Sequence, residues 1–214
     1  MIAVQKFTFS PFSENTFLVW DKQSKEAAMI DPGCFSAGEE QELKNFILEN
    51  QLSIKYLLNT HCHLDHIFGN NFILKEFDPQ YLIPELDKPL LENAPAQARL
   101  FGLEMAAVQP SDNFLSEETV LSLGEHEVRF LFTPGHTPGE FCIHFPGDSI
   151  CFTGDVLFEN SIGRTDLLGG NFSTLMKSIQ QKLFTLPEET VIYPGHGNSS
   201  TIGNEKHFNP FFYV

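Results

Sequence analysis

Three histidines and an aspartate crowd into six positions of the sequence. They form the segment His61-x-His63-x-Asp65-His66, which follows the apolar run 54–59. Alternate side chains of an extended segment point the same way, so His61 and His63 can converge on one ion. Asp65 and His66 then turn toward a neighbouring ion. Neutral imidazoles and carboxylates are ligands that Zn²⁺ and Fe²⁺ accept, so the cluster predicts a metal centre at the end of a strand.

Three further candidate ligands each follow a glycine at the end of an apolar run. His136 lies in T-P-G-H-T-P-G, Asp155 in F-T-G-D and His196 in Y-P-G-H-G. Glycine lets the backbone turn sharply there and aim the next side chain into a cleft. Taken singly, a histidine after a glycine is more often an ordinary loop residue than a ligand. Together with the first cluster, however, these residues supply five histidines and two aspartates, enough for two ions that share a bridging carboxylate.

Short strands broken by turn residues are expected to carry the first cluster. The expected strands are 4–9, 15–20, 27–30 and 54–59. Ser36 and Glu39 fit a capping box, which predicts a helix over 37–50. A short helix is expected within 68–77, and a weaker pattern predicts a helix over 86–103, interrupted by prolines.

A second group of strands is expected to carry the remaining ligands. These strands are 120–123, 128–132, 141–145 and 149–153. An apolar stripe over 172–183 predicts a helix that Pro187 stops, followed by a strand over 190–193. The order is strands, helices, strands and helix. The sequence shows no repeat and no linker that would divide the chain, so a single domain is expected.

The charge composition of the chain argues against some classes of binding partner. The chain has 214 residues, with 13 Lys and Arg against 28 Asp and Glu, and a formal charge of −15. A field of that sign repels nucleic-acid phosphates and anionic membrane surfaces, so neither is expected as a partner. No apolar run reaches the 18 residues of a spanning helix, and the first twenty residues lack the pattern of a secretory signal. A cytoplasmic location is therefore expected.

Four cysteines are too few for a disulfide framework in a chain of this length. All four are expected to be thiols, with a bridge between Cys142 and Cys151 as the alternative because they fall in neighbouring predicted strands. Cys62 lies between two candidate ligands and is expected to point the other way, into the core.

In its order of motifs the sequence resembles the metallo-β-lactamase fold superfamily, and within it the glyoxalase II-like (hydroxyacylglutathione hydrolase-like) enzymes. The resemblance spans residues 31–197, and the segments around G-R-T-D and G-H-G are similar to the short, single-domain branch. It implies an α/β fold, a four-layer αβ/βα sandwich of two mixed β-sheets with helices on the outer faces. It also implies one domain over 1–214 without a C-terminal helical glutathione-binding domain, since only 18 residues follow His196.

The resemblance also assigns the ligands of two divalent metal ions, with zinc favoured and iron or manganese as alternatives. Carried over position by position, the first metal is held by His61, His63 and His136. The second metal is held by Asp65, His66 and His196, and Asp155 bridges the two. Asp65 and Asp155 are expected to be catalytic as well as metal-binding. Asp65 would also position the hydroxide.

The implied reaction is hydrolysis of a small-molecule thioester by a metal-bridging hydroxide, as in hydroxyacylglutathione hydrolases. Two cations lower the pKa of a bound water toward about 7, and a thiolate leaves without a dedicated general acid. Arg164 could bind an anionic group of the substrate, or it could form a loop ion pair with Asp166. Asp31 could orient a ligand histidine, or it could simply stabilise a turn.

Two other functions compete with hydrolysis. Persulfide dioxygenases also resemble this chain, and they hold one Fe²⁺ with two histidines and a carboxylate, which here would be His61, His136 and Asp155. A non-catalytic binding module would have lost ligands, whereas all seven positions are filled. A β-lactamase is disfavoured by the missing export signal and by the carboxylate at the bridging position, and a nuclease by the charge of −15.

Overall fold

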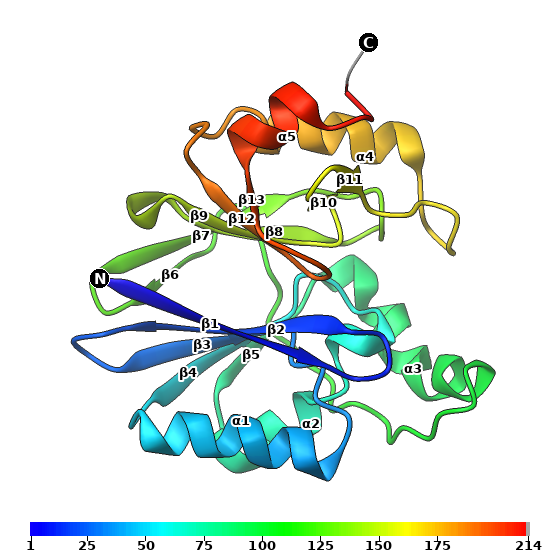
Figure 1. Ribbon diagram of the computed structural model, residues 1–214. Coiled ribbons are helices and arrows are strands. Elements are labelled where there is room, and N and C mark those ends of the chain that lie inside the picture. The colour runs from blue at the N-terminus through cyan, green and yellow to red at the C-terminus, as the bar shows by residue number, and fades with distance from the viewer. Residues whose placement is uncertain (213–214) are drawn as a thin grey trace. The chain divides into compact units, whose positions relative to one another are not determined.

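The computed structural model describes residues 1–212, which divide into two compact units (Figure 1). The first unit contains residues 1–114 and 123–126, and the second contains 115–122 and the chain from 127 onward. Each unit is built on one β-sheet with helices packed against it. Both sheets are mixed, which confirms the α/β class; the expectation of a single domain stays a prediction.

The sheet of the first unit has five strands in the order β1-β2-β3-β4-β5. Their bounds are Ile2–Phe9, Glu14–Asp21, Glu26–Ile30, Ser53–Leu58 and Gln80–Leu82. The first three strands are antiparallel neighbours, whereas β3, β4 and β5 run parallel. The carboxyl ends of β3 and β4 therefore meet at one edge of the sheet, where the first group of predicted ligands lies.

Two helices cover one face of this sheet: α1 (Ala37–Glu49) and α2 (Asn70–Phe77) (Figure 1). The predicted capping box of α1 is confirmed, since Ser36 accepts a hydrogen bond from the Glu39 amide and the Glu39 side chain accepts one from Ser36. Leu43 and Ile47 of α1 are fully buried against strand residues such as Leu18. An N-terminal cap and an apolar face thus fix this helix on its sheet.

A third helix packs beneath the candidate ligand loop. After a short 3₁₀ turn (η2, Glu85–Asp87), α3 runs from Lys88 to Leu100. Pro89 lies at its start and Pro95 inside it, so Pro95 costs the helix a hydrogen bond without ending it. Leu91 and Ala94 belong to the same buried cluster as Cys62. This segment therefore supports the loop that carries the first histidines.

The second sheet has six strands in the order β13-β12-β9-β8-β7-β6. From β6 to β9 their bounds are Val120–Leu123, His126–Phe132, Phe141–Phe145 and Ile150–Gly154; β12 is Val191–Pro194 and β13 is Ser200–Thr201. β7, β8 and β9 are antiparallel neighbours, and β12 lies parallel to β9. A small hairpin of β10 (Leu157–Phe158) and β11 (Ser161–Ile162) follows β9.

Two helices, α4 (Phe172–Ser178) and α5 (Ile202–Phe208), pack on this sheet (Figure 1). Asn171 and Thr201 cap them by accepting hydrogen bonds from the third helical amide. The expected helix over 172–183 is only partly α-helical, because a π turn (η4, Ile179–Leu183) takes over after Ser178. The apolar stripe still reaches the core through Leu175, Ile179 and Leu183.

All four cysteines are buried and free, which confirms the thiol prediction over the alternative of a bridge. Cys62 is fully buried, as expected. Burial raises the pKa of the Cys34, Cys62 and Cys142 thiols. Among residues 1–212, no helix has both the length and the apolarity needed to cross a bilayer.

The capping box of α1 provides a test of the fold. Ser36→Ala removes the acceptor for the Glu39 amide and is expected to lower the free energy of unfolding by about 1 kcal/mol. Urea unfolding followed by circular dichroism measures this change. Gln41→Ala, an exposed substitution within the same helix, is the control and should change stability by less than about 0.5 kcal/mol. Equal effects of the two substitutions would contradict the capping role.

Candidate metal centre

Four of the seven predicted ligands lie together in the first unit, in the loop after β4. His63 is the N-cap of a 3₁₀ turn (η1, Leu64–His66) that contains Asp65 and His66. The ring centroids of His61 and His63 are 4.9 Å apart, and those of His61 and His66 are 4.0 Å apart. Asp65 Oδ2 lies 3.9 Å from His66 Nε2. The spacing along the chain therefore produces a compact cluster of imidazoles with a carboxylate beside it.

The Asp31 carboxylate holds this cluster from the neighbouring strand end. Its Oδ1 accepts a hydrogen bond from the Thr60 amide at 2.8 Å, and its Oδ2 accepts one from the Thr60 hydroxyl at 2.6 Å. The same Oδ2 lies 3.2 Å from His66 Nδ1. Of the two roles open to Asp31, the structure shows the one in which it orients a histidine. One Asp31 oxygen also lies within 4.8 Å of a ring nitrogen of His61 and of His66, so Asp31 could itself reach a metal ion. Both Asp31 oxygens, however, already accept hydrogen bonds.

These contacts determine which ring nitrogen carries the proton. His66 Nδ1 faces a carboxylate oxygen and must donate, which leaves the lone pair on Nε2. The Thr60 hydroxyl already donates to Asp31, so at 3.1 Å it accepts from His61 Nδ1. His61 therefore also carries its lone pair on Nε2. Metal-binding histidines typically show this arrangement, with the second nitrogen held by an oxygen acceptor.

The other three predicted ligands lie together in the second unit. His136 and Asp155 are buried, whereas the side chain of His196 is partly exposed. His136 Nε2 is 3.5 Å from Asp155 Oδ2, and His196 Nε2 is 3.7 Å from the same oxygen. Donor atoms around an ion with bonds of about 2.1 Å are separated by roughly 3.4 Å in a tetrahedron. Both the donor types and their separations thus fit a divalent metal ion.

Backbone contacts set the orientation of His136. Its Nδ1 lies 2.8 Å from the carbonyl oxygen of Arg164, which can only accept, so His136 also presents its lone pair on Nε2. Gly163 makes this approach possible, because a Cβ there would lie 1.8 Å from the Asp155 carbonyl oxygen. The chain after β11 is therefore pressed against two of the predicted ligands, and only glycine fits at that point.

The guanidinium of Arg164 forms a bidentate ion pair with Asp166. The two hydrogen bonds, from Nε and Nη2, are 2.7 and 2.8 Å long, and both side chains are more than half exposed. Arg164 lowers the pKa of Asp166 to about 2. Of the two roles open to Arg164, the loop ion pair is present, while a role in substrate binding stays a prediction.

The sequence did not reveal several polar residues that support the ligand loops: Glu14, Thr60, Asp87 and Glu140. Glu140 is fully buried and accepts a hydrogen bond from the Asp155 amide at 2.7 Å. Asp87, also buried, accepts one from the Cys62 amide at 3.3 Å. Neither residue stands in a recognisable spacing to its partner. Glu140 directly follows the T-P-G-H-T-P-G segment, and that position was the one available signal.

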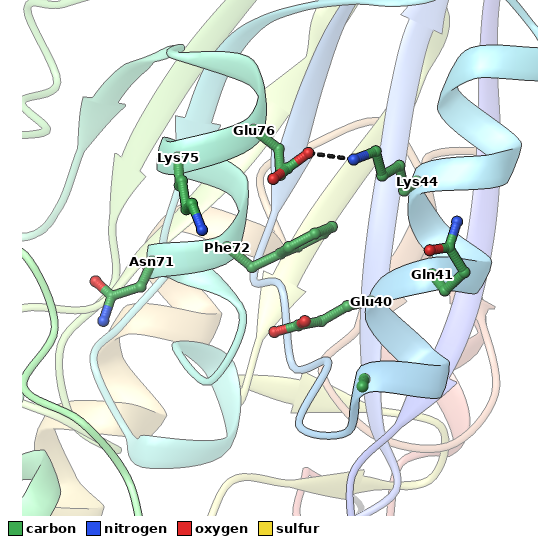
Figure 2. A pocket seen from close by; sticks show the side chains of 8 residues that line it. Glu40, Gln41, Lys44, Asn71, Phe72, Lys75 and Glu76 are labelled. Carbon is green, nitrogen blue, oxygen red and sulfur yellow. Dashed lines mark hydrogen bonds and ion pairs between the residues drawn. The ribbon is translucent and has the colours of Figure 1, made fainter.

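A separate hollow of about 460 Å³ lies between α1 and α2 of the first unit (Figure 2). Figure 2 shows Phe72 between the two helices and an ion pair that joins Lys44 to Glu76. The residues that line the hollow carry charges of both signs and include none of the seven predicted ligands. The hollow is therefore distinct from the group of candidate ligands in the first unit.

Comparison with known proteins identifies the family of this chain. A family model described as the metallo-beta-lactamase superfamily matches residues 10–196. The hydroxyacylglutathione hydrolase GloC of Haemophilus influenzae is 42% identical over 202 residues, which cover 94% of this chain and 93% of that protein. The match thus extends over almost the whole of both chains.

Solved structures also match this chain in sequence and fold. The B3 metallo-beta-lactamase BLEG-1 is 33% identical with a TM-score of 0.90, covering 99% of this chain and 100% of that one. A di-iron-bound form of TTHA1623 is also 33% identical, with a TM-score of 0.86 and coverage of 97% and 99%. ETHE1 from Myxococcus xanthus is 27% identical, with a TM-score of 0.77 and coverage of 97% and 83%. By family model, sequence and fold, the chain belongs to the metallo-beta-lactamase superfamily.

Proposed function

We propose that the seven residues form one dinuclear metal centre that hydrolyses a thioester of the hydroxyacylglutathione type. The observation that carries this proposal is the state of the three buried histidines: His61, His66 and His136 each have Nδ1 engaged by an oxygen, which leaves Nε2 to bind metal. The assignment of His61, His63 and His136 to one ion and of Asp65, His66 and His196 to the other follows the family resemblance. Asp155 would bridge the two ions.

The metal ions and the residues around them would have separate roles in the reaction. Two bound divalent cations would supply a hydroxide at neutral pH and polarise the thioester carbonyl. The Asp65 carboxylate, beside His66, would orient the attacking water by accepting its hydrogen bond. The departing thiol has a pKa near 8.5, so it leaves as a thiolate without a proton from the protein. Zinc is the favoured metal, and the same His and Asp ligands also suit iron and manganese.

Glutathione as the thiol half of the substrate is supported by the 42% identity to a protein named hydroxyacylglutathione hydrolase. The guanidinium of Arg164 would bind a carboxylate of such a substrate. Its pairing with Asp166 uses Nε and Nη2, so the edge formed by Nη1 stays available for a second acceptor. In this role Asp166 orients the guanidinium toward the substrate.

A cytoplasmic location, and the absence of nucleic-acid and membrane partners, remain part of the proposal. The absence of nucleic-acid and membrane partners rests on the formal charge of −15, which opposes binding to polyanions.

A mononuclear iron persulfide dioxygenase is the second candidate function. It is supported by the likeness to ETHE1 from Myxococcus xanthus, at 27% identity and a TM-score of 0.77. The iron would be held by His61, His136 and Asp155. Iron at one ion per chain, together with oxygen uptake when glutathione persulfide is added, would favour this function over hydrolysis.

The first test is hydrolysis of S-lactoylglutathione by protein reconstituted with zinc, iron or manganese. Loss of the thioester absorbance gives the rate, and a kcat/KM above about 10⁴ M⁻¹s⁻¹ is expected with two ions bound per chain. Nitrocefin, a β-lactam, serves as the control substrate and should be hydrolysed far more slowly. A value orders of magnitude lower for the thioester, with both ions present, would reject this substrate.

The second test separates one metal ion from two. His196→Ala is expected to lower bound metal from two ions to one and to reduce kcat/KM at least about 100-fold, because it removes a ligand of the second ion. Metal analysis and thioester kinetics measure both effects. His207→Ala is the control, since His207 is exposed and pairs with Glu188. If His196→Ala keeps its metal content and its activity, the dinuclear assignment is wrong.

The third test concerns Arg164. Arg164→Ala is expected to raise KM for S-lactoylglutathione about tenfold and to leave kcat nearly unchanged, because it removes a cation that binds the substrate's carboxylate. The backbone carbonyl that orients His136 is retained. Arg129→Ala, which removes another exposed arginine paired with a glutamate, is the control. An unchanged KM would assign Arg164 to the loop ion pair alone.

A further inference from the structure

Glu14, the first residue of β2, is a fully buried carboxyl that the proposed reaction does not use. Its Oε2 accepts a hydrogen bond from the Thr16 hydroxyl at 2.9 Å. Its Oε1 is buried and has no hydrogen-bond partner in the part of the chain that the structure describes. Burying a carboxyl with one unsatisfied oxygen is costly, so its position calls for a compensating role.

A chain of hydrogen bonds leads from Glu14 to the turn that follows β3. Thr16 Oγ1, which donates to Glu14, accepts from the Gly33 amide at 2.7 Å. On the other side of this turn, the Pro32 carbonyl accepts from the Gly69 amide at 2.7 Å. The turn Asp31-Pro32-Gly33 is therefore held between the start of β2 and the start of α2.

Packing around Gly33 brings the Glu14 carboxyl close to the ligand loop. A Cβ at Gly33 would lie 2.0 Å from Glu14 Oε2 and 2.7 Å from the backbone oxygen of Asp65. The absence of a side chain at Gly33 thus leaves just enough room for the carboxyl on one side and the Asp65 backbone on the other. Any displacement of Glu14 opens a void next to both the Asp31 turn and the η1 turn.

We propose that Glu14 is a positioning residue for the metal ion held by His66 and Asp65: through Thr16 and Gly33 it fixes the turn that presents Asp31 to His66. This inference rests on the proposed function, because it takes His66 and Asp65 to be ligands. Glu14 itself does not contact the metal. Its effect reaches the ion through the hydrogen bond between Asp31 and His66.

The test is a titration of the metal-free full-length protein with Co²⁺, followed by visible absorption and by competition with a chromophoric chelator. Glu14→Ala and Thr16→Val are each expected to weaken one of two Co²⁺ sites by about 10- to 100-fold and to shift its absorption band. Glu14→Gln should remain close to the wild type, because the amide oxygen can still accept from the Thr16 hydroxyl. Rescue by glutamine would not be expected if any change at this position simply weakened the fold.

Leu43→Ala is the matched control for lost stability. Leu43 is fully buried in α1 of the same unit, and its truncation should lower the melting temperature without altering either Co²⁺ affinity. If Glu14→Ala fails to fold, Thr16→Val carries the test. Wild-type affinity at both sites in Thr16→Val and Glu14→Ala, or equal weakening in Leu43→Ala, would overturn the inference.

Thioester hydrolysis, measured in parallel, keeps the two proposals apart. In one outcome the wild type binds two Co²⁺ ions but hydrolyses no thioester, and Glu14→Ala binds one of the two ions more weakly. This would reject the proposed reaction and keep the role of Glu14. In another outcome the wild type is active and Glu14→Ala binds both ions normally, which would keep the proposed reaction and reject the role of Glu14. A wild-type protein without any Co²⁺ site would reject both.

Discussion

The Asp31 carboxylate joins two chain segments that are distant in sequence and adjacent in the first sheet. β3 and β4 run parallel with Ile30 beside Leu58, so the residues that follow them emerge at the same edge. Asp31 has a left-handed backbone with φ of 47°, a conformation that costs a non-glycine residue on the order of 1 kcal/mol. Its hydrogen bonds to Thr60 and His66 offset that cost, since bonds to a charged acceptor are the stronger kind. The orientation of His66, and that of His61 through Thr60, depends on this one side chain.

The second unit orients its ligands by other means. His136 is held by a backbone carbonyl, that of Arg164, and Asp155 by the hydrogen bond from its amide to Glu140. A carbonyl is present whatever the side chain, so what the sequence must conserve there is the path of the chain, which Gly163 makes possible. In the first unit the group that orients the histidines is a side chain, whereas in the second unit the group that orients His136 belongs to the backbone. Substitutions should therefore affect the two halves unequally.

The grouping of the candidate ligands was predictable from the sequence because they stand close together or follow glycines at strand ends. The capping box of α1 and the longer strands were predictable for a related reason, since each depends on residues a few positions apart. Three-residue β5 and two-residue β13 were missed, because they are too short to show alternation. α5 was missed as well, although Thr201 caps it. Supporting contacts such as Glu140 to Asp155 join residues 15 positions apart and leave no local pattern.

The burial of the cysteines has a consequence for redox chemistry. Thiol–disulfide exchange requires a thiolate that can reach the attacking or attacked sulfur, and burial denies both access and ionisation. Cys34, Cys62 and Cys142 have raised pKa values, and Cys151 is fully buried in the same core cluster of the second unit as Cys142. A protein whose thiols are buried in this way can meet free thiols or disulfides without forming mixed disulfides. Its folded state is thus expected to be inert toward the thiol that the proposed reaction would release.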